Sequence, residues 1–491
     1  MGMRFLLDTN ILIPLEDSQV ALAPSLASFV RLASDHGHPL VYHPASESDI
    51  QRDSDIRRRQ ATLQRLRQYE RLNHLPPCPW NDSQTNPNDT VDNEILYAIS
   101  QYVAKFLVTE DLGIHRKARN RGLEDKVLTI QMAADLLRRL HERSEVRLPN
   151  ITEIPLHAII GHLPTTFFDS LREGYPGFDA WFQGKAQEGR KAWACRSEDG
   201  HLRGLCIFAI QINERVTGEG TMLQGQALKL CTFKVADEER GQKIGELLLK
   251  AAFKYASKNQ IENIFITADP QRQQRLIDLL EDFGFESIGH DRRDEVLLKR
   301  HPANPPPVGE DALEYNRAFF PHYMDGSDIQ KFIVPVLPPF HRILFPDYQR
   351  VGDPQPLFEV PQGNAAGNAI KLAYLSHANT NQTQPGDLVL FYRSGDHKAV
   401  TSVGVVERFE TLSDAEAIIG LVRRRTVYSM EEIQEKADRP TKVILFRLVK
   451  HLPRPVQFPR LKRDGILNGP PQSITKIPHE GYLKLMDASR E

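Results

Sequence analysis

The sequence predicts a multidomain protein in which an α/β domain, an α+β domain and an all-β domain follow one another. Three observations lead to this prediction. The chain has 491 residues, more than one hydrophobic core usually serves, and length alone suggests about three domains. Apolar runs alternate with helical patterns through residues 1–147, and residues 148–300 mix strand and helix patterns. Residues 301–312 contain HPANPPPVG, typical of a Pro-rich linker, and short apolar runs between turns fill residues 313–491.

The composition is that of globular domains: 40% of the residues are apolar, 26% are charged, and the formal net charge is −2. This charge excludes a uniformly basic coat for nucleic acid but leaves local basic surfaces open. The four cysteines show neither zinc-type spacing nor a disulfide pattern, which favours reduced thiols. No apolar run approaches the ~20 residues that cross a bilayer, and no leader pattern opens the sequence. We therefore expect a cytoplasmic protein without a membrane partner.

Four aspartates, Asp8, Asp49, Asp92 and Asp111, lie at the ends or starts of predicted elements in residues 1–147. Asp8 and Asp111 follow the apolar runs FLL and FLV, and Asp92 opens DNEILYAI, which has helical spacing. Carboxylates at strand ends and helix starts meet in space while staying apart in sequence, and such a cluster suits Mg²⁺ or Mn²⁺. Taken singly, each acid is explained as well by a helix cap or a solvated charge.

The segments FLLDTNILI, DNEILYAI and FLVTED resemble those of the PIN-domain ribonucleases, whose fold is an α/β sandwich. The resemblance implies that the four aspartates hold one or two Mg²⁺ or Mn²⁺ ions for hydrolysis of an RNA phosphodiester. It also implies that Asn10 and Thr109 orient a metal ligand or the attacking water. Of the four acids, Asp49 has the weakest match to the family's pattern, and Glu47 is the alternative residue for its position.

Residues 52–71 form an Arg-rich predicted helix beside the aspartates. A solvated helix with internal salt bridges explains this composition as well as a nucleic-acid surface does. A site built from carboxylates repels a polyanion, so cations are needed nearby to hold RNA. On that hypothesis Arg57, Arg58 and Arg59 contact the RNA backbone.

Residues 148–300 contain a predicted hairpin, the strand LKLCTFKV, a polar loop, an amphipathic helix, the strand IENIFITAD and a final helix ended by FGF. Small residues where a helix begins leave backbone N–H groups open to an anion. This order, with RGQKIG between strand and helix, resembles the GNAT acyltransferases. The resemblance implies a site for acetyl-CoA or CoA formed by Val235, Arg240, Gly241, Gln242, Lys243, Ile244 and Gly245.

Three positions depart from the GNAT pattern. Lys243 stands where a glycine is usual, where its side chain either crowds the phosphates or pairs with them. Gln273 replaces a common asparagine, and Leu280 replaces a tyrosine that protonates the leaving thiolate in many members. The sequence names no general base. Acyl transfer and simple binding of acyl-CoA therefore both remain open.

PGDLVLFYRS followed by AVTSVGVVERFE resembles the PUA-like barrels of the ASCH and EVE kind. The resemblance implies an RNA-binding β-barrel in which aromatic faces stack on bases and arginine adds affinity. The candidates are Tyr392 and Arg393. Period-2 alternation equally allows Phe391 and Tyr392 to be ordinary strand residues, one facing inward and one outward.

Three hypotheses about function follow. The first is a metal-dependent ribonuclease with a fused CoA-binding GNAT-like domain and an RNA-reading barrel. A role as a toxin or in defence, an antitoxin partner and a homodimer are further expectations of this hypothesis. The second is a GNAT N-acetyltransferase that acts on RNA, aminoacyl-tRNA or protein, with residues 1–147 as a scaffold. The third is a regulator without chemistry, in which CoA binding reports metabolic state.

Overall fold

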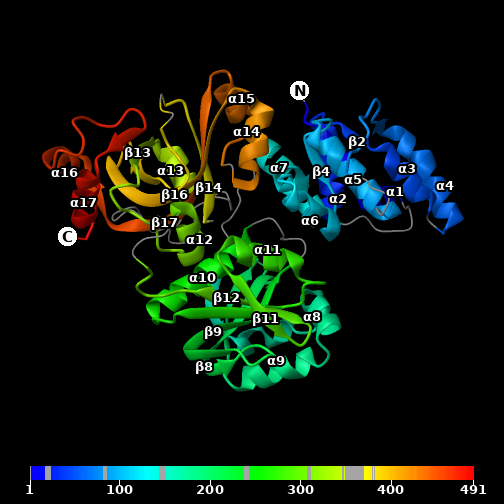
Figure 1. Cartoon of the computed structure of the whole chain (residues 1–491), viewed down its shortest axis with the longest axis horizontal. Coiled ribbons are helices and arrows are strands. Elements are labelled where there is room, and N and C mark those ends of the chain that lie inside the picture. Colours follow the sequence, from blue (N-terminus) through cyan, green and yellow to red (C-terminus); the bar gives the residue numbers. More distant parts are fainter. Residues whose placement is uncertain are drawn as a thin grey trace. The chain divides into compact units, whose positions relative to one another are not determined.

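The structure is a computed structural model that divides into two compact units. Unit 1 comprises residues 1–144 and 412–440, and unit 2 comprises residues 145–411 and 441–491. The described residues are 2–16, 24–52, 54–80, 86–142, 151–197, 199–236, 243–306, 311–345, 348, 370–378, 380, 382–425 and 427–490. Figure 1 shows the elements of both units.

Unit 1 contains a parallel sheet of five short strands in the order β3-β2-β1-β4-β5. The strands are β1 (Phe5–Leu7), β2 (Leu40–Tyr42), β3 (Glu70–Arg71), β4 (Phe106–Val108) and β5 (Val127–Leu128). Leu6 packs with Ile95 on one face of the sheet, and Phe5 packs against Phe29 on the other, with ring centroids 5.3 Å apart. Helices therefore cover both faces, as a parallel sheet requires.

The helices of unit 1 begin where the sequence supplies caps. Asn86 accepts a hydrogen bond from Asp89 N before α5, and Asp111 accepts one from Ile114 N before α6. Pro at the first position sets the start of α3 and α5. The helices are α1 (Thr9–Glu16), α2 (Pro24–Asp35), α3 (Pro44–Gln51), α4 (Ile56–Arg65), α5 (Pro87–Ser100), α6 (Leu112–Asn120) and α7 (Ile130–His141), with the 3₁₀ turns η1 (Leu66–Gln68) and η2 (Glu124–Lys126).

A helical pair from far along the chain completes unit 1. It consists of α14 (Ala415–Val422), the 3₁₀ turn η7 (Arg423–Arg425) and α15 (Met430–Ala437). Ile418 and Ile419 of α14 are fully buried, and Arg423 pairs with Asp125 at 2.6 Å. Residues 412–440 thus belong with the N-terminal unit, although sequence order alone groups them with residues 313–491.

The first sheet of unit 2 has seven strands in the order β11-β12-β10-β9-β8-β7-β6. They are β6 (Ile151–Pro155), β7 (Lys191–Arg196), β8 (Leu202–Arg215), β9 (Met222–Val235), β10 (Asn263–Ala268), β11 (Glu286–Asp291) and β12 (Asp294–Arg300). The pair β9–β10 is parallel, and the other pairs recorded for this sheet are antiparallel. The register of β9 with β10 runs only from Ala227–Asn263 to Leu230–Ile266, although β9 continues to Val235.

Two hydrophobic clusters hold helices on opposite faces of this sheet. One contains Leu248 of α10 (Ile244–Lys258) and Ile277 of α11 (Gln274–Asp282). The other contains Phe182 of α9 (Phe178–Gln187) and Leu171 of α8 (Asp169–Gly174), with the 3₁₀ turns η3 (Leu156–His162) and η4 (Thr166–Phe168). This three-layer α+β arrangement is the one that the sequence predicts for residues 148–300.

The second sheet of unit 2 has six strands in the order β14-β17-β16-β15-β13-β18. They are β13 (Lys331–Val336), β14 (Lys371–Ser376), β15 (Leu388–Arg393), β16 (Ala399–Leu412), β17 (Thr441–Gln457) and β18 (Thr475–Ile477). The accompanying helices are α12 (Ala312–Phe319), α13 (Pro338–Leu344), α16 (Phe458–Arg463) and α17 (His479–Ala488). In the described part of the chain the edge strands β14 and β18 do not pair with each other, so this sheet is open. The closed barrel expected from the sequence is not confirmed, since closure needs that extra pairing.

Buried charges join the two sheets of unit 2. Arg447 of β17 is 0% exposed, and its Nε donates to Glu407 at 2.6 Å. Its Nη2 donates to the backbone oxygen of Asp282 in α11 at 2.8 Å. Lys371 of β14 also pairs with Asp282. Burial of a guanidinium costs several kcal/mol, so these partners are needed for the two sheets to stay packed.

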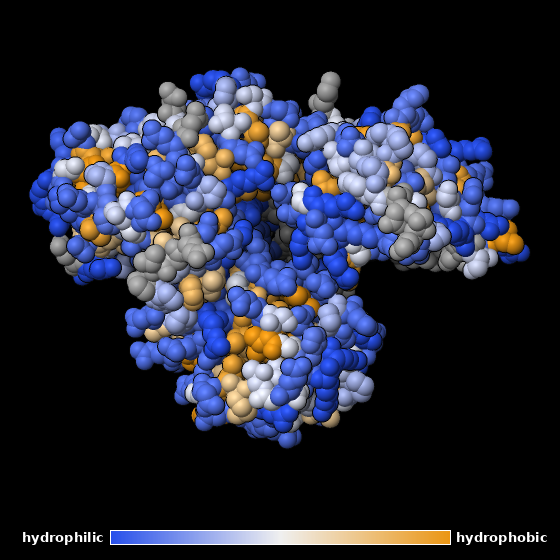
Figure 2. All heavy atoms as spheres, viewed as in Figure 1, coloured by the Kyte–Doolittle hydropathy of each residue, from blue (hydrophilic) through white to orange (hydrophobic). Residues whose placement is uncertain are grey.

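On the face shown in Figure 2, hydrophilic residues predominate and hydrophobic residues form separate small groups. None of the helices in the described ranges is both long and apolar enough to span a bilayer.

We expect Arg447→Met to destabilise unit 2 by about 3–5 kcal/mol, because it leaves the buried Glu407 carboxylate without its partner. Denaturant unfolding followed by circular dichroism measures the change. Arg408→Met, which removes a half-exposed pair with Glu410, is the control and should cost less than about 1 kcal/mol. Equal effects of the two substitutions would show that the buried Arg447 guanidinium, with its contacts to Glu407 and Asp282, does not stabilise unit 2.

Candidate functional site

The parallel strands of unit 1 bring three of the four aspartates together at one edge of the sheet. Asp8 directly follows β1, Asp111 lies just beyond β4, and Asp92 lies on α5. Because β1 and β4 are parallel neighbours, their carboxyl ends meet at the same edge. Thr109 Oγ1 links two of these aspartates, since it donates to Asp8 Oδ2 at 2.7 Å and accepts from Asp111 N at 3.0 Å. The charges of Asp92 and Asp111 both raise the pKa of Asp8.

Asp8 is the most buried of these acids, at 5% exposure. Its two carboxylate oxygens accept hydrogen bonds from Thr9 N and Thr109 Oγ1, each at 2.7 Å. Asn10 Nδ2 donates to Thr109 Oγ1 at 3.2 Å, so the two expected orienting residues are tied to Asp8. Burial raises the pKa of Asp8 to about 6; the two hydrogen bonds oppose this rise, and the neighbouring acids add to it.

Lys117 of α6 supplies a positive charge to this cluster. Its Nζ lies 2.8 Å from Asp92 Oδ2 and also pairs with Asp89. Desolvation is the largest influence on the pKa of Asp92 and raises it, although the Lys117 ammonium opposes this effect. Asp111 Oδ1 caps α6 through Ile114 N at 3.0 Å. The carboxylates are therefore already engaged by groups of the chain itself.

The fourth predicted ligand, Asp49, is not drawn into the cluster. It lies in α3 and pairs with Arg52 at 3.1 Å. Its competitor Glu47 accepts hydrogen bonds from Tyr42 and Arg71, each at 2.9 Å. Among the described residues, no group of three or more His, Cys, Asp and Glu side chains is arranged to hold a metal ion. As they stand, these carboxylates do not fit the expected Mg²⁺ or Mn²⁺.

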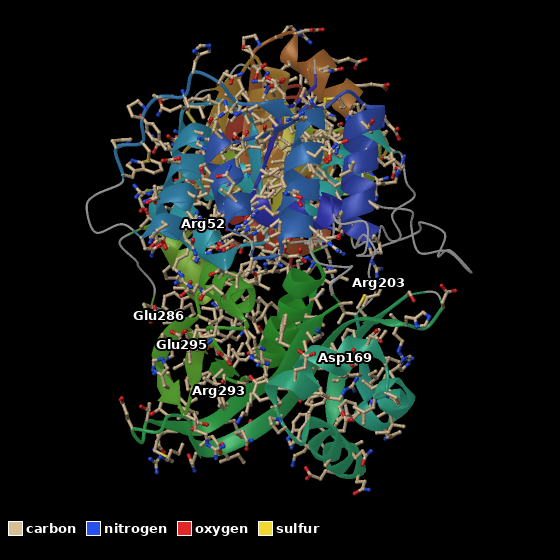
Figure 3. All side chains as sticks on the ribbon, turned by 90° about the vertical axis from the view of Figure 1, so that its right-hand side faces the viewer. Arg52, Asp169, Arg203, Glu286, Arg293 and Glu295 are labelled. Atoms are coloured by element: carbon tan, nitrogen blue, oxygen red, sulfur yellow. The ribbon has the colours of Figure 1, made fainter. Side chains whose placement is uncertain are left out.

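A groove of about 370 Å³ lies between α3 and α5, with Ser48, Arg52, Thr90 and Glu94 among its polar lining residues. Figure 3 labels Arg52 on this unit. Arg52 begins the Arg-rich segment 52–71, but it was not among the predicted RNA contacts, and no motif indicated Thr90; only the packing of α3 against α5 makes the two neighbours. Of the predicted RNA contacts on α4, Arg57 is exposed and Arg59 donates to Gln51 O at 3.2 Å. The side chain of Arg58 lies outside the described residues.

In unit 2, the predicted CoA site lies where β9 and β10 separate. Beyond Leu230 and Ile266 the two strands no longer pair, and α10 begins at Ile244. Val235 ends β9 and is half-buried, and Gly245 lies in the first turn of α10. Arg240, Gly241 and Gln242 lie outside the described residues. The described members thus meet at a separated strand end and a helix start.

Lys243 has a clear role in this structure. It precedes α10 with a φ of 64°, a left-handed conformation that glycine adopts without strain. Its Nζ lies 2.6 Å from Glu246 Oε1, and both side chains are about nine-tenths buried. Glu246 Oε2 also accepts from Lys371 N in β14 at 3.4 Å. Of the two roles left open by the sequence, pairing with phosphate is not the one seen, since the ammonium is paired with Glu246.

Polar side chains gather on the α8–α9 side of β10. Tyr175 OH donates to Gln273 Oε1 at 3.3 Å and to Asp294 Oδ2 at 3.5 Å. Burial and the Asp294 charge raise the pKa of Tyr175 to about 12, so its hydroxyl keeps its proton. Arg293 Nε lies 3.5 Å from Asp269 Oδ2. Arg293 also donates to Gly174 O of α8, and Figure 3 labels Arg293 and Asp169 in this domain.

The predicted RNA contacts of the second sheet do not fit their surroundings. Tyr392 is 1% exposed in the hydrophobic core, and Arg393 is 3% exposed. The guanidinium of Arg393 binds Asp396 with two hydrogen bonds, of 2.9 and 2.5 Å. Neither side chain is available to a base or a phosphate, because β15 is buried on both faces: Phe391, Tyr392 and Arg393 are all buried, so the expected alternation of one inward and one outward residue is not seen.

Sequence reasoning missed a buried polar chain on the other face of that sheet. His341 Nε2 contacts Thr401 Oγ1 at 2.8 Å, Thr401 contacts Ser402 at 3.1 Å, and Ser402 contacts His451 Nδ1 at 2.8 Å. The register of β15 and β16 shifts at Phe391–Tyr392, and this bulge lets the adjacent hydroxyls of Thr401 and Ser402 meet. Neither the bulge nor the two histidines form a recognisable spacing in the sequence.

Residues 156–285 match the family model described as the acetyltransferase (GNAT) family. This segment is a GNAT acetyltransferase domain, and the resemblance seen in the sequence is confirmed over it. No curated protein matches the chain in sequence.

Three solved structures are similar to parts of the chain. ASCH from Zymomonas mobilis is 15% identical, with 32% of this chain and 94% of that chain covered and a TM-score of 0.25. Arylalkylamine N-acetyltransferase 2 from Aedes aegypti is 14% identical, with 32% and 100% covered and a TM-score of 0.25. PaiA N-acetyltransferase from Thermoplasma acidophilum, in complex with coenzyme A, is 17% identical, with 31% and 99% covered and a TM-score of 0.24. These likenesses are too distant to support a conclusion about function.

We expect Asp8→Asn to change how the stability of unit 1 depends on pH. The pKa of Asp8 is raised from 3.8 to about 6 in the folded state, so the unfolded state releases its proton first as pH rises. The contribution of Asp8 to the free energy of unfolding is therefore fully present below about pH 4, where its carboxyl group is protonated. This contribution is lost as the pH rises through 6, a change of about 3 kcal/mol. Denaturant unfolding of chelator-treated protein between pH 4 and 8 measures it. A pH-independent difference between the wild type and Asp8→Asn would contradict this assignment.

Proposed function

We propose that the GNAT domain transfers an acyl group from acyl-CoA to an amine. The observation that carries this proposal is the separation of β9 from β10, with α10 starting just beyond the freed end of β9. Strand ends that no longer pair leave backbone N–H and C=O groups for a ligand. The amide groups of a pantetheine arm are suitable partners for them.

The start of α10 is suited to the pyrophosphate of CoA. Backbone N–H groups of the first turn have no partners within the helix, and the helix dipole adds positive potential there. Glu246 in this turn would oppose an anion, but Lys243 neutralises it at 2.6 Å. Gly245 adds no side chain to this turn, and Leu279 Cδ2 lies 2.8 Å from the place that a Cβ would take.

The reaction needs a neutral amine that attacks the thioester carbonyl carbon. The C–S bond breaks, the amine loses a proton, and the departing thiolate gains one. Leu280 is fully buried and has no hydroxyl, so it cannot supply that proton. The hydroxyl of Tyr175 is a candidate for this role on the α8–α9 side, although a pKa of about 12 makes it a weaker acid than an ordinary tyrosine.

The polar cluster beside β10 favours a cationic acceptor. Asp269 and Asp294 share the single guanidinium of Arg293. Negative charge there attracts a protonated amine and repels a polyanion. Among the acceptors expected from the sequence, a protein amine therefore fits this surface better than RNA or aminoacyl-tRNA.

Gly245→Asp and Gly245→Ala test this proposal as a matched pair. Each adds a Cβ that meets Leu279 Cδ2 at 2.8 Å, the end of a flexible side chain. Only aspartate adds negative charge, and an acid in the first turn does not harm the helix itself. We expect Gly245→Asp to bind CoA about 100-fold more weakly than Gly245→Ala, from repulsion of about 3 kcal/mol. Calorimetry measures binding, and thiol release from acetyl-CoA with amine acceptors measures turnover. The proposal would be rejected if the two variants bound CoA with equal affinity, or if the wild-type protein released no thiol from acetyl-CoA.

A second candidate is hydrolysis of an RNA phosphodiester by unit 1, the first hypothesis from the sequence. The observation that favours it is the convergence of Asp8, Asp92 and Asp111 at one sheet edge. The Lys117 pairing and the position of Asp49 count against it, and we derive no catalytic step through a metal ion.

We expect Asp8→Asn combined with Asp92→Asn to abolish any Mn²⁺-dependent RNA cleavage, because two of the three converging carboxylates lose their charge. The substitutions are nearly isosteric, so the fold should persist by circular dichroism. Asp49→Asn is the matched control and should cleave as the wild type does, since Asp49 lies outside the cluster. Unchanged cleavage by the double variant would remove hydrolysis from this edge of unit 1.

A further inference from the structure

The carboxylate cluster of unit 1 contains its own cation. Lys117 Nζ lies 2.8 Å from Asp92 Oδ2 and pairs at the same time with Asp89. The lysine side chain is 26% exposed and that of Asp92 is 23% exposed, so water screens this pair only in part. One ammonium group with three N–H donors is enough to serve both carboxylates.

The position of Lys117 follows from helix geometry. Asp111 caps α6 at the carboxyl edge of the sheet, and Lys117 lies six residues later in the same helix. That interval is about 1.7 helical turns, or about 9 Å along the helix axis, and a lysine side chain reaches several ångströms beyond its backbone. Asp89 and Asp92 are three residues apart on α5, so both carboxylates face the same direction and converge on this ammonium.

Three other carboxylate oxygens at this edge accept hydrogen bonds from protein donors. Asp8 accepts from Thr9 N and from Thr109 Oγ1, and Asp111 Oδ1 accepts from Ile114 N. A divalent cation at this edge would have to share these oxygens with their donors. At Asp92 Oδ2 it would compete directly with the Lys117 ammonium, which lies 2.8 Å away.

We infer that Lys117 is the resident counter-ion of this cluster and keeps divalent cations out of it. The negative charge that the sequence assigned to Mg²⁺ or Mn²⁺ is balanced here by a side chain of the same domain. A metal ion can bind only when Lys117 has left Asp92, and its affinity is lowered by the strength of that pairing. This inference concerns unit 1 alone and does not depend on acyl transfer in unit 2.

Lys117→Met tests the inference directly, with Mn²⁺ as the probe. Methionine keeps the length and the apolar part of the lysine side chain while removing its charge. We expect the full-length variant to bind Mn²⁺ at least tenfold more tightly than the wild type, as measured by loss of the free Mn²⁺ signal in electron paramagnetic resonance. Adding Asp92→Asn to this variant should abolish the gain.

Two further variants make the experiment decisive. Lys126→Met removes the same charge from unit 1, at a lysine whose Nζ lies over the ring of Tyr102 at 3.8 Å, and should bind Mn²⁺ as the wild type does. Lys117→Gln replaces the methionine variant if that variant fails to fold, and should show the same gain. The inference is overturned if Lys117→Met and Lys126→Met bind equally, or if the gain survives Asp92→Asn. Wild-type protein that already binds Mn²⁺ as tightly as Lys117→Met would overturn it as well.

Discussion

Charged groups that leave water must be neutralised by the chain itself, and this constraint explains the parts of the structure that matter most. Arg447 is fully buried, and it is retained by Glu407 and Asp282 from two other elements of unit 2. Lys243 and Glu246 satisfy each other beside the start of α10. The same rule applies in unit 1, where Lys117 pairs with Asp92. A buried charge without such a partner costs several kcal/mol, which is comparable to the stability of a whole domain.

Both candidate sites lie where parallel strands end. In unit 1 the parallel neighbours β1 and β4 place Asp8 and Asp111 at one edge. In unit 2 the parallel neighbours β9 and β10 separate after Leu230 and Ile266. At such places backbone groups lose their ladder partners, and loops bring in side chains from distant parts of the chain. The two sites offer different chemistry. The sheet edge of unit 1 brings carboxylates together, whereas the separated ends of β9 and β10 in unit 2 place strand backbone near the start of α10.

The two units differ in how well their structures agree with the chemistry predicted from the sequence. Unit 2 contains a GNAT domain over residues 156–285, in which β9 and β10 separate after Leu230 and Ile266. Lys243, which stands where the GNAT pattern usually has a glycine, donates to Lys371 O in β14 at 3.5 Å. This departure from the family pattern therefore has a structural role. Unit 1 brings Asp8 and Asp111 to one edge of its sheet, and the Lys117 ammonium pairs with Asp92 at 2.8 Å, where the sequence predicted a metal ion.

The sequence alone determined the features that arise from local pattern. Alternation of apolar runs and helices indicated the sheet of unit 1, and RGQKIG between strand and helix indicated the GNAT domain that the family match confirms. It also placed Asp8 and Asp111 at element ends, since such positions follow from neighbouring residues, whereas Asp92 lies inside α5, which begins at Pro87 rather than at DNEILYAI. Only the tertiary structure decided which of these side chains meet. Asp49 pairs with Arg52, and Tyr392 lies in the hydrophobic core. Residues 412–440 pack with unit 1, and Lys117 pairs with Asp92. Pairing between distant residues depends on register, helix rotation and packing, and none of these is encoded in the spacing of a single segment.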